Sequence, residues 1–264
     1  MRRTQVRDAI VLRRSPLPSG DVVATLLSPT GTWRAVVRKG RLPGGNLARL
    51  SLFHDVTVQY WRRNDDDLAL VTQVQLNGAL SGLTRPEAYP YAHLLAEMTD
   101  ALTVDHPVSD RWYALLASGL RGLDVHTDPE AVGLAYAWRL IATAGLAPAV
   151  GRCARCDAAP DRLDVADGTA RCAEHGAEHG HASAADAGGG AVAYLGEAGM
   201  QALALLVRGP LGSAVGEPPS DRARHWRTLQ RYVRWHVGEV RALEAIARDA
   251  TARPPPPRSE ATPC

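Results

Sequence analysis

Short apolar segments rich in β-branched residues alternate with turn residues over the first part of the chain. Their partial two-residue alternation predicts strands. The predicted strands cover 5–13, 21–28, 32–38, 52–61 and 67–75. Pro, Gly and Asp residues separate them, and "NDDD" at 64–67 predicts a hairpin between the last two. Five short strands without an intervening helix predict a small barrel, of either the OB-fold or the SH3-like kind.

From Pro86 onward the apolar residues recur every three or four positions, which predicts helices. The predicted helices cover 86–103, 110–123, 129–146, 196–209 and 220–249. Asp128 before Pro129, and Gly145 near the end, are start and stop signals for the third of them. The chain therefore has a strand-rich first part and a helical remainder.

The helix predicted at 220–249 has an apolar face and a basic face. The apolar face carries Trp226, Leu229, Val233, Val237, Val240 and Leu243. The opposite face carries Arg224, Arg227, Arg231, Arg234 and Trp235. One interpretation of the basic face is a solvated surface. The other is a partner contact, in which Arg231 and Arg234 bind phosphates and Trp235 stacks on a base or receives a peptide.

The formal net charge of +2 conceals an uneven distribution of charge. Residues 1–63 hold twelve basic residues against Asp8, Asp21 and Asp55, whereas residues 81–150 hold four arginines against eight acidic residues. A basic first part indicates either a polyanionic partner or a merely solvated surface.

Basic residues gather at the ends of the predicted strands and in the connections between them. The candidate DNA contacts are Arg13, Arg14, Arg34, Arg38, Lys39, Arg41, Arg62 and Arg63. Arg34 and Arg38 are evenly spaced on one strand and can share a face. Such residues contact phosphates, which gives affinity without a choice of sequence. Trp33 and Tyr60 are candidates for base stacking or, alternatively, for the barrel core.

Three of the four cysteines lie in one short stretch with the spacing of a metal site. Cys153-x-x-Cys156 is followed fifteen residues later by Cys172-x-x-His175. Two such turns supply four tetrahedral positions, and thiolates favour zinc, so the spacing predicts one structural Zn²⁺. The fourth ligand stays open, because the other histidines within reach are His179 and His181. The alternative is a set of free buried cysteines.

Other chemistry for this cluster fits less well. A redox pair would need a βαβ setting around Cys-x-x-Cys, and a zinc deaminase would need an upstream His-x-Glu; neither pattern is present. Four available ligands predict a closed site without an open position for substrate. Glu174 and Glu178 lie near the ligands, so a metal-dependent hydrolase or deaminase stays an alternative.

These patterns together predict an α+β protein. The expected parts are an OB-fold barrel at 1–80, an all-α domain at 81–150 and 192–249, a zinc-binding insertion at 151–191 and a disordered Pro-rich tail at 250–264. No run of about eighteen apolar residues occurs, so no membrane span is expected, and a cytoplasmic location is the default expectation.

Several segments, taken in order, resemble the bacterial recombination mediator RecO. They are "AIVLRR" and "GDVVATLLSPTGTWRAVVRKG" within 9–40, "YAHLLAEMTDAL" at 91–102, and "WRLIATAGLAP" at 138–148 ahead of "RCARC". The resemblance spans about residues 1–248 and rests on their order and spacing. The chain departs from the zinc-bearing members of this family in having His175 where a fourth cysteine is usual, and in its His- and Gly-rich stretch at 175–190.

The resemblance implies an OB-fold domain, a helical domain and a zinc element in a nucleoid-associated protein that is not an enzyme. It implies binding of single- and double-stranded DNA, annealing of complementary strands, and cooperation with RecR in bringing RecA onto DNA coated by single-stranded DNA-binding protein. It also implies that the barrel and the first helix, including His93, approach RecR, although His93 could simply pack against the barrel. A zinc-ribbon RNA-binding or transcription-associated module is the alternative.

Overall fold

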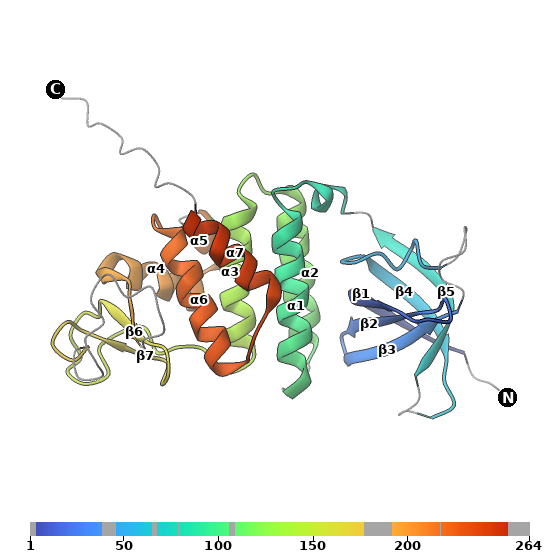
Figure 1. The fold of residues 1–264 in the computed structure, drawn as a ribbon, viewed down its shortest axis with the longest axis horizontal. Coiled ribbons are helices and arrows are strands. Elements are labelled where there is room, and N and C mark those ends of the chain that lie inside the picture. Colours follow the sequence, from blue (N-terminus) through green and yellow to red (C-terminus); the bar gives the residue numbers. More distant parts are fainter. Residues whose placement is uncertain are drawn as a thin grey trace, which may run out of the picture.

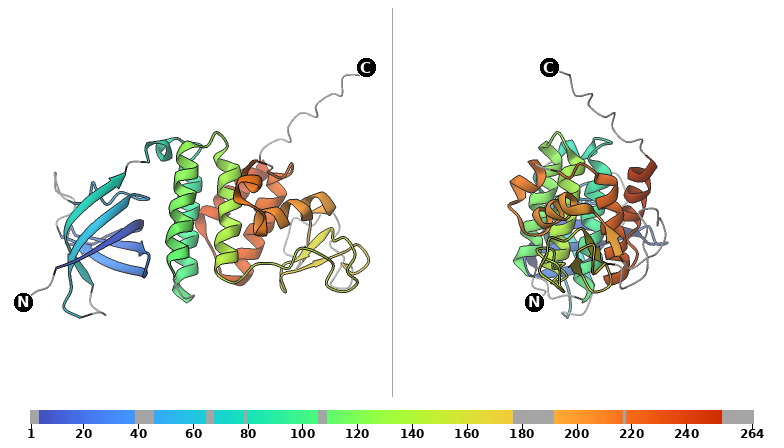
Figure 2. Two further views of the ribbon diagram at one scale, coloured as in Figure 1. Left: turned by 180° about the vertical axis from the view of Figure 1, so that it is seen from behind. Right: turned by 90° about the vertical axis from the view of Figure 1, so that its left-hand side faces the viewer.

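The computed structural model describes residues 4–38, 46–64, 68–78, 80–105, 109–176, 192–216 and 218–252. A β-barrel, a helical body and a small sheet follow one another along the long axis, so that the barrel and the small sheet lie at opposite ends (Figures 1 and 2). The candidates Lys39, Arg41, His179 and His181 lie outside the described residues, as do residues 182–191 of the predicted insertion and the tail from 253.

The first five strands close into a barrel. They are β1 (Gln5–Pro16), β2 (Val22–Ser28), β3 (Gly31–Val37), β4 (Asp55–Trp61) and β5 (Ala69–Gly78). Their order is β1-β2-β3-β5-β4, and β4 pairs with β1 to close the sheet. Only the β3–β5 pair is parallel. This is an OB-like barrel, which confirms the predicted fold and leaves the SH3-like alternative aside.

Alternation along the strands gives the barrel two apolar surfaces. Val56, Val58 and Tyr60 of β4 point into the interior and are almost fully buried. Ile10 and Leu27 point the other way and join the core of the helical body. The barrel and the helices therefore pack against each other through apolar side chains.

The helical body contains a 3₁₀ turn and seven helices among the described residues. The turn is η1 (Ser81–Thr84), and the helices are α1 (Tyr89–Asp105), α2 (Asp110–Val125), α3 (Pro129–Thr143), α4 (Gly196–Arg208), α5 (Leu211–Gly216), α6 (Arg222–His236) and α7 (Arg241–Ala252). Helix α3 lies at the centre, with eleven buried residues. None of these helices is long and apolar enough to cross a membrane, within the part of the chain that was described.

The single helix predicted at 220–249 is wrong, because the chain breaks there into α6 and α7. Gly238 adopts a φ of +116°, in the region that favours glycine. Its N–H donates to the carbonyl of Val233 in the last turn of α6, which ends the helix. Val240 and Leu243 remain buried beyond the break. The apolar spacing thus continues across a turn, which explains why it predicted one helix.

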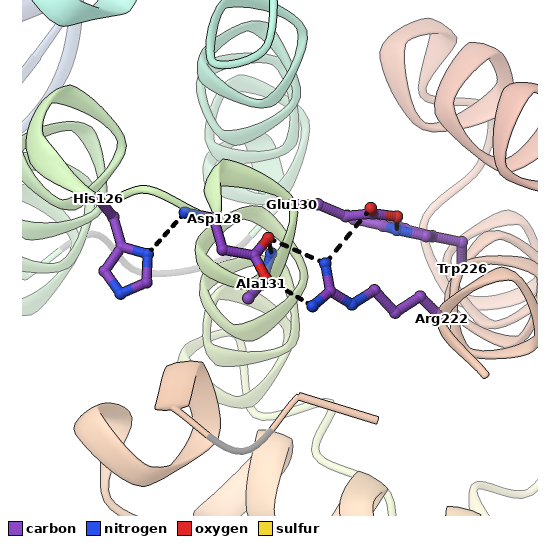
Figure 3. A network of polar contacts seen from close by, with 6 residues as sticks. All are labelled: His126, Asp128, Glu130, Ala131, Arg222 and Trp226. Carbon is purple, nitrogen blue, oxygen red and sulfur yellow. Dashed lines mark hydrogen bonds and ion pairs between the residues drawn. The ribbon is translucent and has the colours of Figure 1, made fainter. Parts of the chain in front are cut away.

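A polar network fixes the start of α6 against the start of α3 (Figure 3). Arg222 donates from Nη1 to Asp128 Oδ1 at 2.9 Å and from Nη2 to Oδ2 at 2.5 Å, and it also reaches Glu130. Trp226 Nε1 donates to Glu130 at 3.0 Å, and Asp128 accepts from the Ala131 N–H as the N-cap of α3. Burial alone would raise the pKa of Asp128, but the hydrogen bonds from Arg222 and Ala131 hold it below its ordinary value.

The small sheet is built from three-residue strands that the sequence pattern did not predict. They are β6 (Arg162–Asp164), β7 (Thr169–Arg171) and β8 (Val192–Tyr194), in the order β7-β6-β8. Strand β8 follows the predicted insertion at 151–191 in sequence, yet it completes the same sheet. We refer to residues 149–176 together with β8 as the cysteine element.

Candidate functional site

Two turns of the cysteine element bring Cys153, Cys156, Cys172 and His175 together. Their ligand atoms all lie within 4.8 Å of one another. Cys156 Sγ lies 3.6 Å from Cys172 Sγ, and His175 Nδ1 lies 3.3 Å from Cys172 Sγ and 4.0 Å from Cys153 Sγ. A tetrahedral zinc ion would hold such atoms about 3.3–3.8 Å apart. The cluster, called the metal centre below, is compatible with a zinc site.

The surroundings of Cys153 and Cys172 favour their thiolate forms. Burial would raise the pKa of the Cys153 thiol, but the N–H groups of Arg155, Cys156 and Cys172 that point at its sulfur lower it to about 6. The hydrogen bond with the His175 ring lowers the pKa of Cys172, and the same contact raises the pKa of His175. Thiolates that already accept hydrogen bonds are good ligands for a metal ion.

Helix α6 holds the cysteine element through bonds to its backbone carbonyls. Arg231 Nη2 donates to Val192 O at 3.1 Å, and Tyr232 Oη donates to Leu146 O at 2.9 Å, just before the element. His236 Nε2 lies 2.8 Å from Val165 O. Arg231, a candidate phosphate contact, is therefore half-buried and engaged with the protein itself.

The other two candidates on α6 have different surroundings. Arg234 is exposed and pairs with Glu244 at 2.8 Å and with Glu239 at 3.8 Å. The Trp235 side chain is 64% exposed, a large value for an aromatic residue. Of the predicted basic face of α6, Trp235 is thus the candidate most open to a partner.

The candidates on the barrel are mostly exposed. Arg34 and Arg38 project from β3 and its end, and Arg63 follows β4. Arg14 and Arg62 are half-buried. Arg13 is exposed but pairs with Asp100 of α1 at 3.2 Å.

Trp33 and Tyr60, the candidates for base stacking or for the barrel core, lie beside each other in the barrel. Tyr60 is buried in the barrel core, and Trp33 is half-buried beside it, with ring centroids 4.6 Å apart. Arg7, which sequence reasoning missed, lies over both rings. The signal that could have found it is alternation, because Arg7 shares the inward-facing positions of β1 with Ala9 and Val11.

His93 lies at the junction between the barrel and α1. Its ring meets Phe53 edge-on, with centroids 5.0 Å apart, and Tyr89 at 4.6 Å. Phe53 itself has a φ of +69°, which is uncommon for a bulky residue. Burial lowers the pKa of His93, while the Glu97 charge opposes this shift.

His93 also lines a cavity of about 510 Å³ at this junction. The cavity has apolar walls, formed partly by Leu12, and polar groups that include Arg14 and Asp100. A hollow of this size with a few charged groups is suited to a ligand or to side chains of a partner.

Comparison with known proteins agrees with this architecture. The family model "Recombination protein O C terminal" matches residues 83–243. The DNA repair protein RecO of Thermobifida fusca is 30% identical over 91% of this chain and 97% of its own length. The proteins of the same name from Frankia casuarinae and Anaeromyxobacter sp. (strain K) are 29% and 31% identical, over 91% and 87% of this chain and 97% and 90% of their own lengths. The chain therefore belongs to the RecO family of DNA repair and recombination proteins.

Proposed function

We propose that this protein is a DNA-binding mediator of recombinational repair that is not an enzyme. In this proposal it binds single- and double-stranded DNA and anneals complementary strands. With RecR, it brings RecA onto single strands covered by single-stranded DNA-binding protein. The three relatives described above are each called DNA repair protein RecO, which supports the repair role.

The observation that carries the proposal is the state of the barrel arginines. Arg34, Arg38 and Arg63 are exposed, and none of them forms an ion pair with another described residue. Exposed guanidinium groups without carboxylate partners are free to replace the counterions of a phosphate backbone. By contrast, the two candidates on α6, Arg231 and Arg234, are engaged with the protein. The barrel is therefore the favoured DNA surface.

The proposed role of the metal centre is structural, with Zn²⁺ as the ion. Three thiolates and one imidazole are the donors that zinc prefers. Four protein ligands fill a tetrahedron and leave no place for a metal-bound water, which disfavours the hydrolase and deaminase alternatives. The metal would cross-link the turn at Cys153 to the turn at Cys172. The segment between these turns contains only two three-residue strands, β6 and β7, so the cross-link would stabilise it.

The proposed RecR contact lies at the junction of the barrel and α1. This assignment follows from the family resemblance, and the cavity beside His93 is consistent with it. The edge-on contact with Phe53 supports the competing role of His93 in packing. Trp235 is a second proposed partner contact because its ring is exposed.

The test compares three nucleic acids of equal length and sequence: single-stranded DNA, duplex DNA and single-stranded RNA. Titration of each with the purified protein should give binding to both DNA forms, and complementary strands should anneal faster with the protein present. A protein that binds only the RNA would support the RNA-binding alternative instead. Failure to bind any of the three at low salt would remove the proposal.

A further inference from the structure

Four side chains meet where β1 begins and β4 ends, and we call them the barrel-end cluster. Arg7, Trp33 and Tyr60 share the inward-facing positions of their strands, and Arg62 follows β4. The Arg7 guanidinium carbon lies 5.5 Å from the Trp33 ring centroid and 5.8 Å from that of Tyr60. The Arg62 guanidinium carbon lies 5.9 Å from the Tyr60 centroid. Two cations are thus held against a pair of aromatic rings.

The polar groups of this cluster are incompletely matched. Among the described residues, Arg7 has the two rings as its partners and no carboxylate. The Trp33 Nε1–H is buried without an acceptor there. Tyr60 is satisfied, since its hydroxyl donates to Gln5 Oε1 at 2.7 Å. The acidic residues Asp65, Asp66 and Asp67 follow in sequence but lie outside the described residues.

A guanidinium that lies over aromatic rings keeps two capacities. Its N–H groups can still bind a phosphate, because no carboxylate occupies them. Its planar outer face can stack on a further flat group, as guanidinium planes do on exposed nucleobases. A guanidinium with a free planar face and a positive charge suits a base and its own phosphate better than it suits a peptide side chain.

We propose that the barrel-end cluster is a subsite for one nucleotide of an unpaired strand. The base stacks on the outer face of the Arg7 guanidinium, whose inner face lies over Trp33 and Tyr60, and the Arg7 N–H groups bind the neighbouring phosphate. This inference rests on the proposed DNA-binding function and deepens it. Bases in a duplex are already paired and stacked, so the subsite gives the barrel a preference for single strands, which exposed arginines alone cannot give.

The test separates stacking from charge by using two probes: a single-stranded oligo(dT) and an abasic strand of the same length, which has the phosphates without the bases. The wild-type protein should bind oligo(dT) about tenfold more tightly than the abasic strand, the scale of one stacked base. Arg7→Lys keeps the charge but loses the planar face. It should remove most of this preference while leaving affinity for the abasic strand and for duplex DNA within about twofold.

Two further variants keep the result interpretable. Arg121→Lys, at an exposed position of helix α2 with no proposed binding role, should retain the full preference. Arg7→Gln, which loses the charge as well as the planar guanidinium, should weaken both single-stranded probes by several-fold, and it serves as the second test if Arg7→Lys does not fold. If the wild type binds neither probe, the DNA-binding function itself fails. If the wild type binds but folded Arg7→Lys keeps the whole preference for oligo(dT), the subsite is wrong and the function stands.

Discussion

Arg13 of strand β1 and Asp100 of helix α1 form an ion pair of 3.2 Å that links the barrel to the helical body. Two hydrogen bonds across the same junction support it, from Thr32 to Thr103 at 3.2 Å and from Tyr113 to Asp55 at 2.9 Å. Arg13 therefore contributes less free charge to the barrel than its exposure suggests. The junction that it spans contains His93 and the cavity proposed to meet RecR.

The RecR contact is tested by His93→Ala. The variant should bind DNA with unchanged affinity, because His93 belongs to α1 and is not one of the barrel arginines proposed to contact DNA. It should co-elute poorly with RecR in size-exclusion chromatography, because the variant lacks the imidazole side chain at the proposed RecR contact. Arg208→Ala, an exposed residue at the end of α4 with no proposed partner role, is the control. Normal co-elution of His93→Ala would leave His93 with a packing role alone.

Elemental analysis of the purified protein should find about one zinc ion per chain. Cys153→Ser should lose the metal and lower the melting temperature, because the sheet β7-β6-β8 then lacks its cross-link. DNA affinity should stay unchanged, since the barrel lies at the opposite end of the molecule (Figure 1). Metal-free protein obtained without chelators would contradict the structural assignment of the four ligands.

Removal of the Arg222 side chain should destabilise the helical body. Arg222→Ala leaves the half-buried carboxylates of Asp128 and Glu130 without their shared cation. We expect a loss of about 1–2 kcal/mol in the free energy of unfolding, seen as a melting temperature lower by roughly 3–6 °C. Arg224→Ala, which removes an exposed pair with the N-cap Asp221 and a contact of the guanidinium with the Tyr194 ring, should cost less, at most about 1 kcal/mol. Equal losses of unfolding free energy in the two variants would show that the network in Figure 3 stabilises the protein no more than an exposed ion pair does.

His225 should make stability depend on pH. Burial lowers its pKa from the ordinary 6.5 to about 4, with the Asp221 charge opposing this shift and Arg224 adding to it. Between pH 6.5 and pH 4 the unfolded chain binds a proton at this residue and the folded protein does not. Unfolding free energy should therefore fall by about 3 kcal/mol across this range because of His225 alone. Urea denaturation at several pH values gives the unfolding free energy of wild type minus that of His225→Phe. This difference should be constant above about pH 6.5 and should decrease as the pH falls below it.

Sequence patterns predicted the elements that repeat a simple period. Strand β4 alternates, and α3 has a start signal at Asp128 and a stop signal at Gly145, so both were predicted within a few residues. The strands of the cysteine element have three residues each, too few for any period to be detected. The break at Gly238 was missed because Val237 and Val240 keep helical spacing across it.

Local spacing also determined which parts of the site could be predicted. The four side chains of the metal centre lie in two short motifs, and the structure brings their ligand atoms within 4.8 Å of one another. Contacts between distant segments gave no such signal. Arg222 meets Asp128 across 94 positions, and Arg231 meets a backbone carbonyl 39 positions away, which no pattern of side chains records.

The central claim is that DNA binds the barrel through its exposed arginines, and the salt dependence of binding tests it most directly. Arg34, Arg38 and Arg63 are changed together to Ala, and Arg111, Arg208 and Arg248, exposed arginines of the helical body, are changed together as a control. The slope of log affinity for single-stranded DNA against log salt concentration should fall by about 2 in the barrel variant, at roughly 0.7 per lost phosphate contact. The control should keep the wild-type slope. An unchanged slope in a folded barrel variant would contradict the claim and place the DNA elsewhere on the molecule.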